Sequence, residues 1–311
     1  MMSFTNKLII SFTGVYLIWG STYLAVKISL EGFPSFLMAA IRFFIAGLLF
    51  FLIAYFKGDS RPTLKDWKNG LITGFMMNFC GQGLNFLVAK EVPSSIVALI
   101  CAIAPLLITF FDSLFFTKQK LSIFVISGLV IGFTGVINLL SPDSSMNFNY
   151  LLTLPIIISS IFWALGSLIP KKLDMNSSSF VNLGTQLLSS SFFFIISSLL
   201  MGELTNFSFT QVSIKSFLAL IYLITFGSIV VFTCYDWLLK NYDASKVSTY
   251  GFVNPVIAVI MGNLFGNEPI TFKVILSASI ILFGVIIIIA SKSKTKINFD
   301  FNKEKNQLSY E

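Results

Sequence analysis

The chain has 311 residues, of which 55% are hydrophobic and only 11% charged, with a mean hydropathy of +0.85. These values lie outside the range of soluble globular proteins and indicate an integral membrane protein. Histidine is absent, which excludes histidine-ligated metals and histidine general bases. Cys80, Cys101 and Cys234 all lie inside apolar segments, so we expect no disulfide framework and no CxxC metal site. We accordingly expect no metal, no cofactor and no catalytic residue.

Apolar segments follow one another along the chain, each close to the roughly 20 residues that a helix needs to cross a bilayer. We expect spans at about 8–29, 34–56, 68–89, 93–116, 120–140, 149–170, 178–201, 213–239, 244–266 and 271–290. The first segment has neither a basic leader nor a small-residue cleavage site, so we expect a retained span. The expected fold class is an all-α polytopic membrane protein with ten transmembrane helices.

The basic residues are divided unevenly between the two sides of the expected membrane. With the N-terminus in the cytoplasm, 16 of the 21 lysines and arginines fall on the cytoplasmic side. Four fall on the opposite side: Lys27, Lys90, Lys215 and Lys273. This asymmetry follows the positive-inside rule and predicts a multi-pass protein of the cell (inner or plasma) membrane with both termini cytoplasmic. The net charge of +7 is then an orientation signal, and we expect no nucleic-acid partner.

The sequence contains an internal repeat, which we interpret as a duplication of one membrane unit. A Trp–Lys pair with eight-residue separation recurs at an offset of 144 residues, as Trp19 and Lys27 and again as Trp163 and Lys171. Because five spans are an odd number, the second copy enters the membrane from the opposite face. We therefore expect inverted five-helix repeats at 1–142 and 143–290, followed by a disordered cytoplasmic tail at 291–311. Inverted repeats are typical of alternating-access carriers, whose substrate site lies near the midplane between the halves.

Short motifs in order along the chain carry a family resemblance. They are Trp19-Gly20-Ser21-Thr22-Tyr23, Arg42-Phe43, Val253-Asn254-Pro255 and Gly266-Asn267-Glu268-Pro269. With the duplication, they resemble the EamA-type family of the drug/metabolite transporter superfamily over roughly residues 10–290. The resemblance implies a ten-helix inverted-repeat fold and export of small metabolites such as amino acids. This chain has Gln119 where the family commonly carries a glutamate, so any role for that carboxylate survives only at Glu268.

Polar and aromatic residues inside the expected spans are the candidates for substrate binding. They are Trp19, Ser21, Thr22, Arg42, Asn78, Gln82, Asn85, Trp163, Gln186, Tyr250 and Asn254. Arg42 lies deep in its span, where a cation is a functional-site hypothesis by default. Its alternative use is structural, by snorkelling or by joining two helices through backbone carbonyls. Its repeat partner, Gln186, is neutral.

Other candidates form local patterns. Asn78, Gln82 and Asn85 have i, i+4, i+7 spacing and share one helix face, which either lines a cavity or packs closely through nearby glycines. Tyr250 and Asn254 lie one turn apart before Pro255, where a kink is expected. The two tryptophans either stack on a flat or cationic ligand or pack in the core.

Charged residues near the span ends are interpreted as ion pairs near the membrane surface. Asp112 and Asp236 lie close to cytoplasmic ends beside lysines, which favours interfacial pairing over proton coupling. Lys27 and Glu31 are at i, i+4 on the outer rim, and we expect them to pair with each other.

We expect a secondary transporter that rocks one half on the other to move, and export, a small metabolite or drug-like compound. The GxxxxGK[ST] loop is absent, so no ATP hydrolysis is expected. The lack of a mid-membrane carboxylate favours a facilitator or an exchanger. Two alternatives remain: an intramembrane enzyme, and a non-transporting sensor or scaffold without a polar midplane cavity. Small-residue faces are compatible with a homodimer but do not require one, and the bilayer itself is the remaining expected partner.

Overall fold

The computed structural model describes residues 3–118, 122–140, 149–173, 175, 177–205, 207–241, 247 and 249–292. Gln119, the junction between the expected halves and most of the expected tail lie outside these described residues. Every regular element in the described part of the chain is a helix. Seven helices are long and apolar enough to cross a membrane, and three further apolar helices there are shorter.

The helices follow the expected order along the chain. The first are α1 (Phe4–Thr13), α2 (Trp19–Leu30), α3 (Ser35–Phe56), α4 (Leu64–Thr73), α5 (Gly81–Val88), α6 (Ser94–Cys101), α7 (Ala104–Phe111) and α8 (Ile123–Leu140). The rest are α9 (Leu154–Leu168), α10 (Ser179–Leu200), α11 (Ile214–Ile224), α12 (Val231–Asn241), α14 (Tyr250–Gly266) and α15 (Phe272–Lys292). Wider π-helical turns join or extend several of them, at Gly14–Ile18, Gly74–Cys80, Asp112–Thr117 and Thr225–Val230. Each expected span overlaps one helix or a series of successive helical segments.

Local chemistry explains where the helices begin and break. The helix expected from residue 68 begins at Leu64, because Thr63 and Asp66 form a capping box that extends it into the polar loop. Serine caps α10 through Ser178 and α11 through Ser213. The fourth expected span is broken between α6 and α7, and Pro105 is placed in the first turn of α7, where its missing N–H is tolerated.

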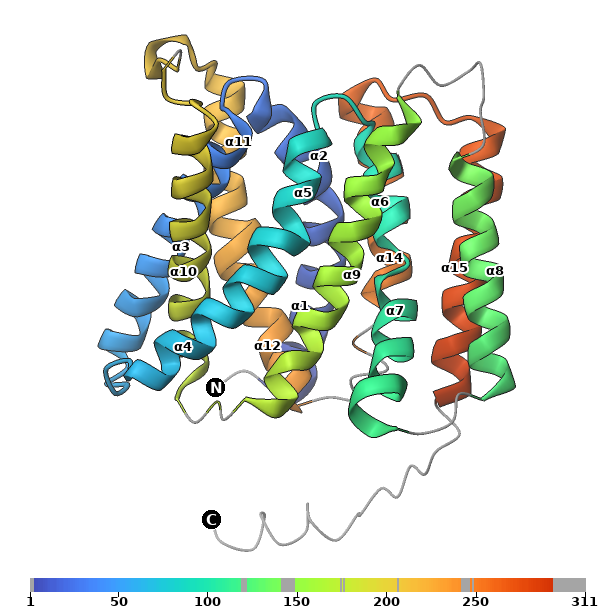
Figure 1. Ribbon diagram of the computed structural model, residues 1–311, viewed down its shortest axis with the longest axis horizontal. Coiled ribbons are helices and arrows are strands. Elements are labelled where there is room, and N and C mark those ends of the chain that lie inside the picture. The colour runs from blue at the N-terminus through green and yellow to red at the C-terminus, as the bar shows by residue number, and fades with distance from the viewer. Residues whose placement is uncertain are drawn as a thin grey trace, which may run out of the picture.

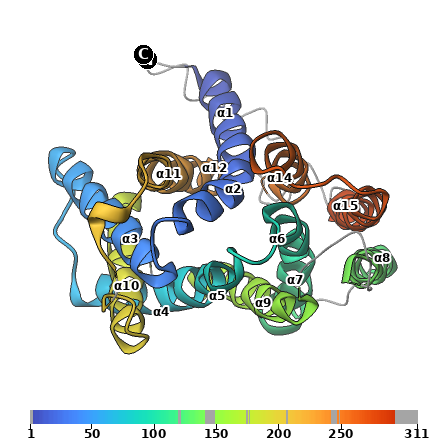
Figure 2. The same ribbon diagram turned by 90° about the horizontal axis from the view of Figure 1, so that it is seen from above.

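The helices pack in pairs along an elongated bundle (Figures 1 and 2). At one end of the bundle α3 packs against α10, and at the other end α8 packs against α15. Between these ends α2 packs against α11 and α14, while α9 packs against α5 and α7. The view from above shows α2, α5, α6 and α9 arranged around the middle of the molecule, which is where the cavity lies.

Two turns related by the 144-residue offset have the same construction. Helix α3 ends at a turn in which Gly58 has φ +74° and the Asp59 N–H donates to the Ala54 carbonyl at 3.0 Å. Helix α10 ends at a turn in which Gly202 has φ +66° and the Glu203 N–H donates to the Ser198 carbonyl, also at 3.0 Å. Glycine is needed at both positions, because a side chain would be strained at positive φ.

Each of these turns also places an acidic side chain against the start of the other helix. The Glu203 carboxylate accepts from the N–H groups of Phe36 (3.1 Å) and Leu37 (2.8 Å) in the first turn of α3. The Asp59 carboxylate accepts from the hydroxyl of Ser178, the N-cap of α10, at 2.5 Å. Helices α3 and α10 are therefore joined at both ends by acidic residues that lie 144 positions apart in the sequence.

Candidate functional site

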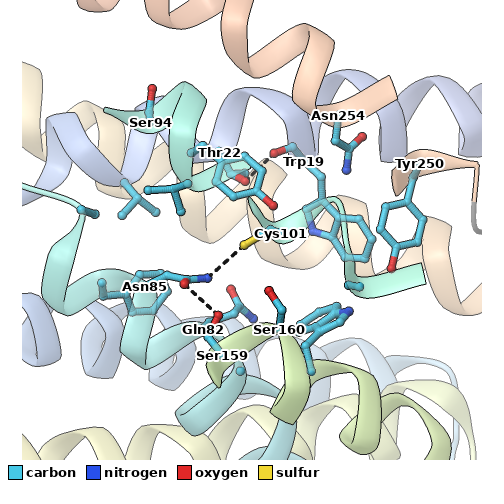
Figure 3. A pocket seen from close by; sticks show the side chains of 18 of the residues that line it. Trp19, Thr22, Gln82, Asn85, Ser94, Cys101, Ser159, Ser160, Tyr250 and Asn254 are labelled. Atoms are coloured by element: carbon cyan, nitrogen blue, oxygen red, sulfur yellow. Dashed lines mark hydrogen bonds between the residues drawn. The ribbon is translucent and has the colours of Figure 1, made fainter. Parts of the chain in front are cut away.

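A cavity lies among α2, α3, α5, α6, α9 and α14 (Figure 3). Its volume is about 120 Å³, several times what one water molecule needs. Eight of the expected binding residues line it: Trp19, Thr22, Arg42, Gln82, Asn85, Trp163, Tyr250 and Asn254. The structure therefore brings together residues from both halves of the chain that are up to 235 positions apart in the sequence.

Aromatic rings form one wall of the cavity. The rings of Trp19 and Trp163 meet edge to face, with centroids 6.0 Å apart and planes at 80°. Tyr250 packs against Trp19 with a centroid distance of 5.2 Å. Tyr235 also packs against Trp19, with a ring-centroid distance of 4.9 Å. The two tryptophans, which are 144 residues apart in the sequence, thus contact each other at the cavity wall.

A small polar cluster forms another part of the lining. The amide of Asn85 accepts from the Ser159 hydroxyl at 2.7 Å and lies 3.5 Å from the Cys101 sulfur (Figure 3). Ser160 also lines the cavity, and its hydroxyl donates to the Ile156 carbonyl at 2.9 Å. These serines and Cys101 were not among the expected residues. The sequence pattern that could have identified Ser159 is its spacing, because it lies one helical turn before Trp163 and therefore on the same helix face.

Three expected residues lie outside the cavity lining. Ser21 bonds to the Tyr222 hydroxyl at 2.6 Å, and the buried Gln186 amide donates to the sulfur of Met77 at 3.8 Å. Asn78 is fully buried and donates to Ser190 at 2.9 Å. Asn78 lies in the π segment Gly74–Cys80, which changes the angular spacing of the side chains that precede α5. An ideal helix would place the three amides on one face. Here Asn78 packs in the interior, whereas Gln82 and Asn85 line the cavity.

Asn254 lines the cavity and also contacts the backbone between α1 and α2. Its amide lies 3.2 and 3.1 Å from the carbonyls of Val15 and Tyr16, and it donates to both when the nitrogen faces them. These carbonyls belong to the π segment Gly14–Ile18. Pro255 follows directly inside α14 and removes one backbone donor there. The side chain of Asn254 thus stabilises irregular backbone beside the cavity.

Arg42 is buried, with 2% of its surface exposed, and lines the cavity from α3. Its Nε donates to the Ser228 hydroxyl at 2.9 Å, and its Nη2 donates to the Gly227 carbonyl at 2.8 Å. Both acceptors are neutral and belong to the π segment Thr225–Val230. The guanidinium also lies over the Phe43 ring, 5.0 Å from its centroid. Arg42 therefore joins two helices and faces the cavity at the same time.

Glu268 forms a buried polar cluster beside the cavity. Its carboxylate accepts from the N–H groups of Ser94 (2.6 Å) and Ser95 (3.0 Å), from the Ser95 hydroxyl (2.7 Å) and from the Lys27 ammonium (2.9 Å). The expected pairing of Lys27 with Glu31 is wrong, because the chain between α14 and α15 brings Glu268 to Lys27. Glu31 instead lies 3.8 Å from Lys215 in an exposed position.

The carboxyl group of Glu268 has a pKa below its usual value of 4.5. Burial raises the pKa, and the hydrogen bonds from Ser95, Lys27 and Ser94 to the charged form outweigh that effect. Gly262 makes room for this group, since a Cβ there would lie 2.5 Å from Oε2. Among the described residues, no group of three or more acidic or cysteine side chains is arranged to hold a metal ion.

Comparison with known proteins gives consistent matches along the chain. The EamA-like transporter family matches residues 6–141 and 151–290. The chain is 31% identical over 279 residues to the uncharacterized inner membrane transporter YedA of Escherichia coli (strain K12), covering 89% of each chain. It is 26% identical to the uncharacterized transporter YvbV of Bacillus subtilis (strain 168), covering 90% of each. A solved crystal structure covers 94% of this chain with a TM-score of 0.66 at 20% identity.

Proposed function

Because the chain belongs to the EamA-like transporter family and is a multi-pass membrane transporter, we propose that it moves a small metabolite by alternating access of the central cavity. The proposed architecture is ten membrane crossings in two inverted five-helix repeats, 1–142 and 143–290. Both termini then lie in the cytoplasm, and the direction of transport is export across the cell membrane.

The observation that carries this proposal is the position of the cavity between the two copies. Trp19 and Trp163 are repeat equivalents and contact each other at the cavity wall. Polar groups such as Asn85 and Arg42 are costly in lipid, and the cavity is what gives them a polar or solvated face. A polar cavity at the contact between inverted repeats is the arrangement on which alternating-access carriers are built.

The packing of the helices supports the same scheme. Helix α2 packs against α11 and α14, in the eighth and ninth expected spans. Helix α9 packs against α5, the π segment Gly74–Cys80, α6 and α7, in the third and fourth expected spans, which are the proposed repeat counterparts. The two matched turns of α3 and α10 face opposite ends of the bundle, as an inverted repeat requires (Figure 1). Rocking one set of helices against the other exposes the cavity to each side in turn.

The native Cys101 offers a direct test, because it lines the cavity. In a Cys80→Ser, Cys234→Ser background, a membrane-impermeant thiol reagent is applied to sealed vesicles of either orientation. Alternating access predicts labelling of Cys101 from both sides, with transported solutes changing the ratio. A further Cys101→Ser change provides the control. The sensor or scaffold alternative would be favoured if Cys101 is labelled from one side at most and if no solute that stabilises the protein changes this labelling.

A further inference from the structure

We propose that Arg42 makes the cavity selective for solutes that carry a carboxylate and excludes solutes whose only charge is positive. This inference names the substrate class of the transporter proposed above and rests on that function. The charge of the lining supports it: among the residues that the structure describes, the cavity is lined by the basic Arg42 and by no aspartate or glutamate. A cavity with this composition has a positive potential that low-dielectric walls strengthen.

The guanidinium of Arg42 contacts only neutral hydrogen-bond acceptors in the described part of the chain. Guanidinium has five N–H donors, and the contacts to Ser228 and Gly227 use Nε and Nη2 only. Arg42 forms no ion pair with any carboxylate in the described part of the chain. A buried cation without an anionic partner is unfavourable unless water or a ligand solvates it. Since Arg42 lines the cavity, the bound solute is in a position to supply the anion.

The guanidinium of Arg42 is held in one position and carries a single charge. The bonds to Ser228 and Gly227 hold the guanidinium against the π segment of the eighth span, so its position is set before a solute binds. One guanidinium matches one carboxylate, and its planar fork suits that group well. A doubly charged phosphate would leave one charge without a partner. The remaining lining of aromatic rings, Asn85 and Ser159 suits a small neutral or apolar body.

The test uses two sets of compounds, each with one hydrocarbon body, whose members differ in whether they carry a carboxylate, an amide or an ammonium group. The first set is phenylalanine, phenylalaninamide, phenethylamine and 3-phenylpropanoate, and the second is valine, valinamide, isobutylamine and 3-methylbutanoate. Binding to the purified full chain is measured by thermal stabilisation and by competition. We expect the carboxylate-bearing members of at least one set to bind about 30-fold more tightly than the amide and amine. Equal or tighter binding of the amide or amine would overturn the inference.

Variants separate charge recognition from helix joining. Arg42→Gln is expected to reduce the carboxylate-over-amide preference to near unity, whereas Arg42→Lys should retain part of it with weaker binding. Ser228→Ala removes one bond of the helix contact and leaves the charge, so the preference should persist. Lys215→Gln removes an exposed cation away from the cavity and is the matched charge control. If Arg42→Gln retains the preference, Arg42 has a structural role only. The same conclusion follows if the preference is lost in Ser228→Ala, which weakens the helix contact and keeps the charge.

Flux measurements distinguish failure of this inference from failure of the transport function. If saturable flux into vesicles is found for the amine or amide members and not for the carboxylates, the transporter stands and the carboxylate selectivity falls. If no member is carried and Cys101 is labelled from one side at most, both proposals fall together.

Discussion

The ammonium of Lys27 and the carboxylate of Glu268 lie 2.9 Å apart although 241 residues separate them in the sequence. Glu268 also accepts hydrogen bonds from the N–H groups of Ser94 and Ser95, the first two residues of α6, where the helix dipole is positive. One carboxylate thus connects the end of α2, the start of α6 and the turn between α14 and α15. This contact joins the two halves beside the cavity.

Replacing Glu268 by glutamine should lower the stability of the protein. The neutral amide loses the ion pair to Lys27, and its NH2 group faces the donors of Ser94 or Ser95. We expect a loss of about 1–3 kcal/mol, seen as a lower melting temperature in detergent. Glu31→Gln is the matched control, because Glu31 is exposed and its partner Lys215 lies 3.8 Å away. Equal effects of the two substitutions would contradict the assigned importance of Glu268.

The contribution of Glu268 should depend on pH in one direction. Its pKa in the folded protein is below the usual value of 4.5, so its stabilising effect is fully present above that value. The effect is lost as the pH falls through the folded-state pKa. The difference in melting temperature between wild type and Glu268→Gln should be constant from about pH 7 to about pH 5 and shrink below that. A difference that grows on acidification would show the opposite shift.

Glu203 should stabilise the start of α3. Its carboxylate accepts the N–H groups of Phe36 and Leu37, which have no acceptor within the helix. Glu203→Ala is expected to cost about 1–2 kcal/mol, measured by thermal unfolding. Glu203→Gln should cost less, since one oxygen can still accept. An alanine variant as stable as the wild type would mean that water replaces the carboxylate at no cost.

Gly74 should tolerate no side chain. A Cβ at this position would lie 2.5 Å from the Gln186 carbonyl and 3.1 Å from the Ser190 nitrogen, both backbone atoms of α10. Gly74→Ala therefore forces the two helices apart, and we expect a loss of about 1–3 kcal/mol. Gly14→Ala is the comparison, because the nearest atom there is the Cys234 sulfur at 3.3 Å, on a side chain that can shift. Similar melting temperatures for both variants would contradict the packing.

Sequence patterns were sufficient for much of the fold. Apolar segment length located the helices, because a helix in lipid must satisfy its backbone internally over the whole thickness of the bilayer. The 144-residue offset also predicted that Trp19 and Trp163 are equivalent, and the same offset relates the Gly58 and Gly202 turns. The helix start at Leu64 was missed, since a capping box in a polar loop has no hydropathy signal.

The candidate site was predictable only in part. Spacing selected Gln82 and Asn85, which line the cavity, and also Asn78, which lies in the π segment and makes a buried contact with Ser190. Ser159 and Cys101 were not selected, because single small polar residues are common in spans and only the neighbouring helix shows what they face.

The sequence by itself determined that this is a helical membrane protein with residues that recur at a 144-residue offset and with charged and polar groups inside its spans. That follows from composition and periodicity, which express the solvent properties of the bilayer locally along the chain. Only the tertiary structure decided the partners: Glu268 rather than Glu31 for Lys27, and neutral acceptors for Arg42. Partner choice depends on which helix ends meet in space, and short-range patterns carry no information about contacts between residues 241 positions apart.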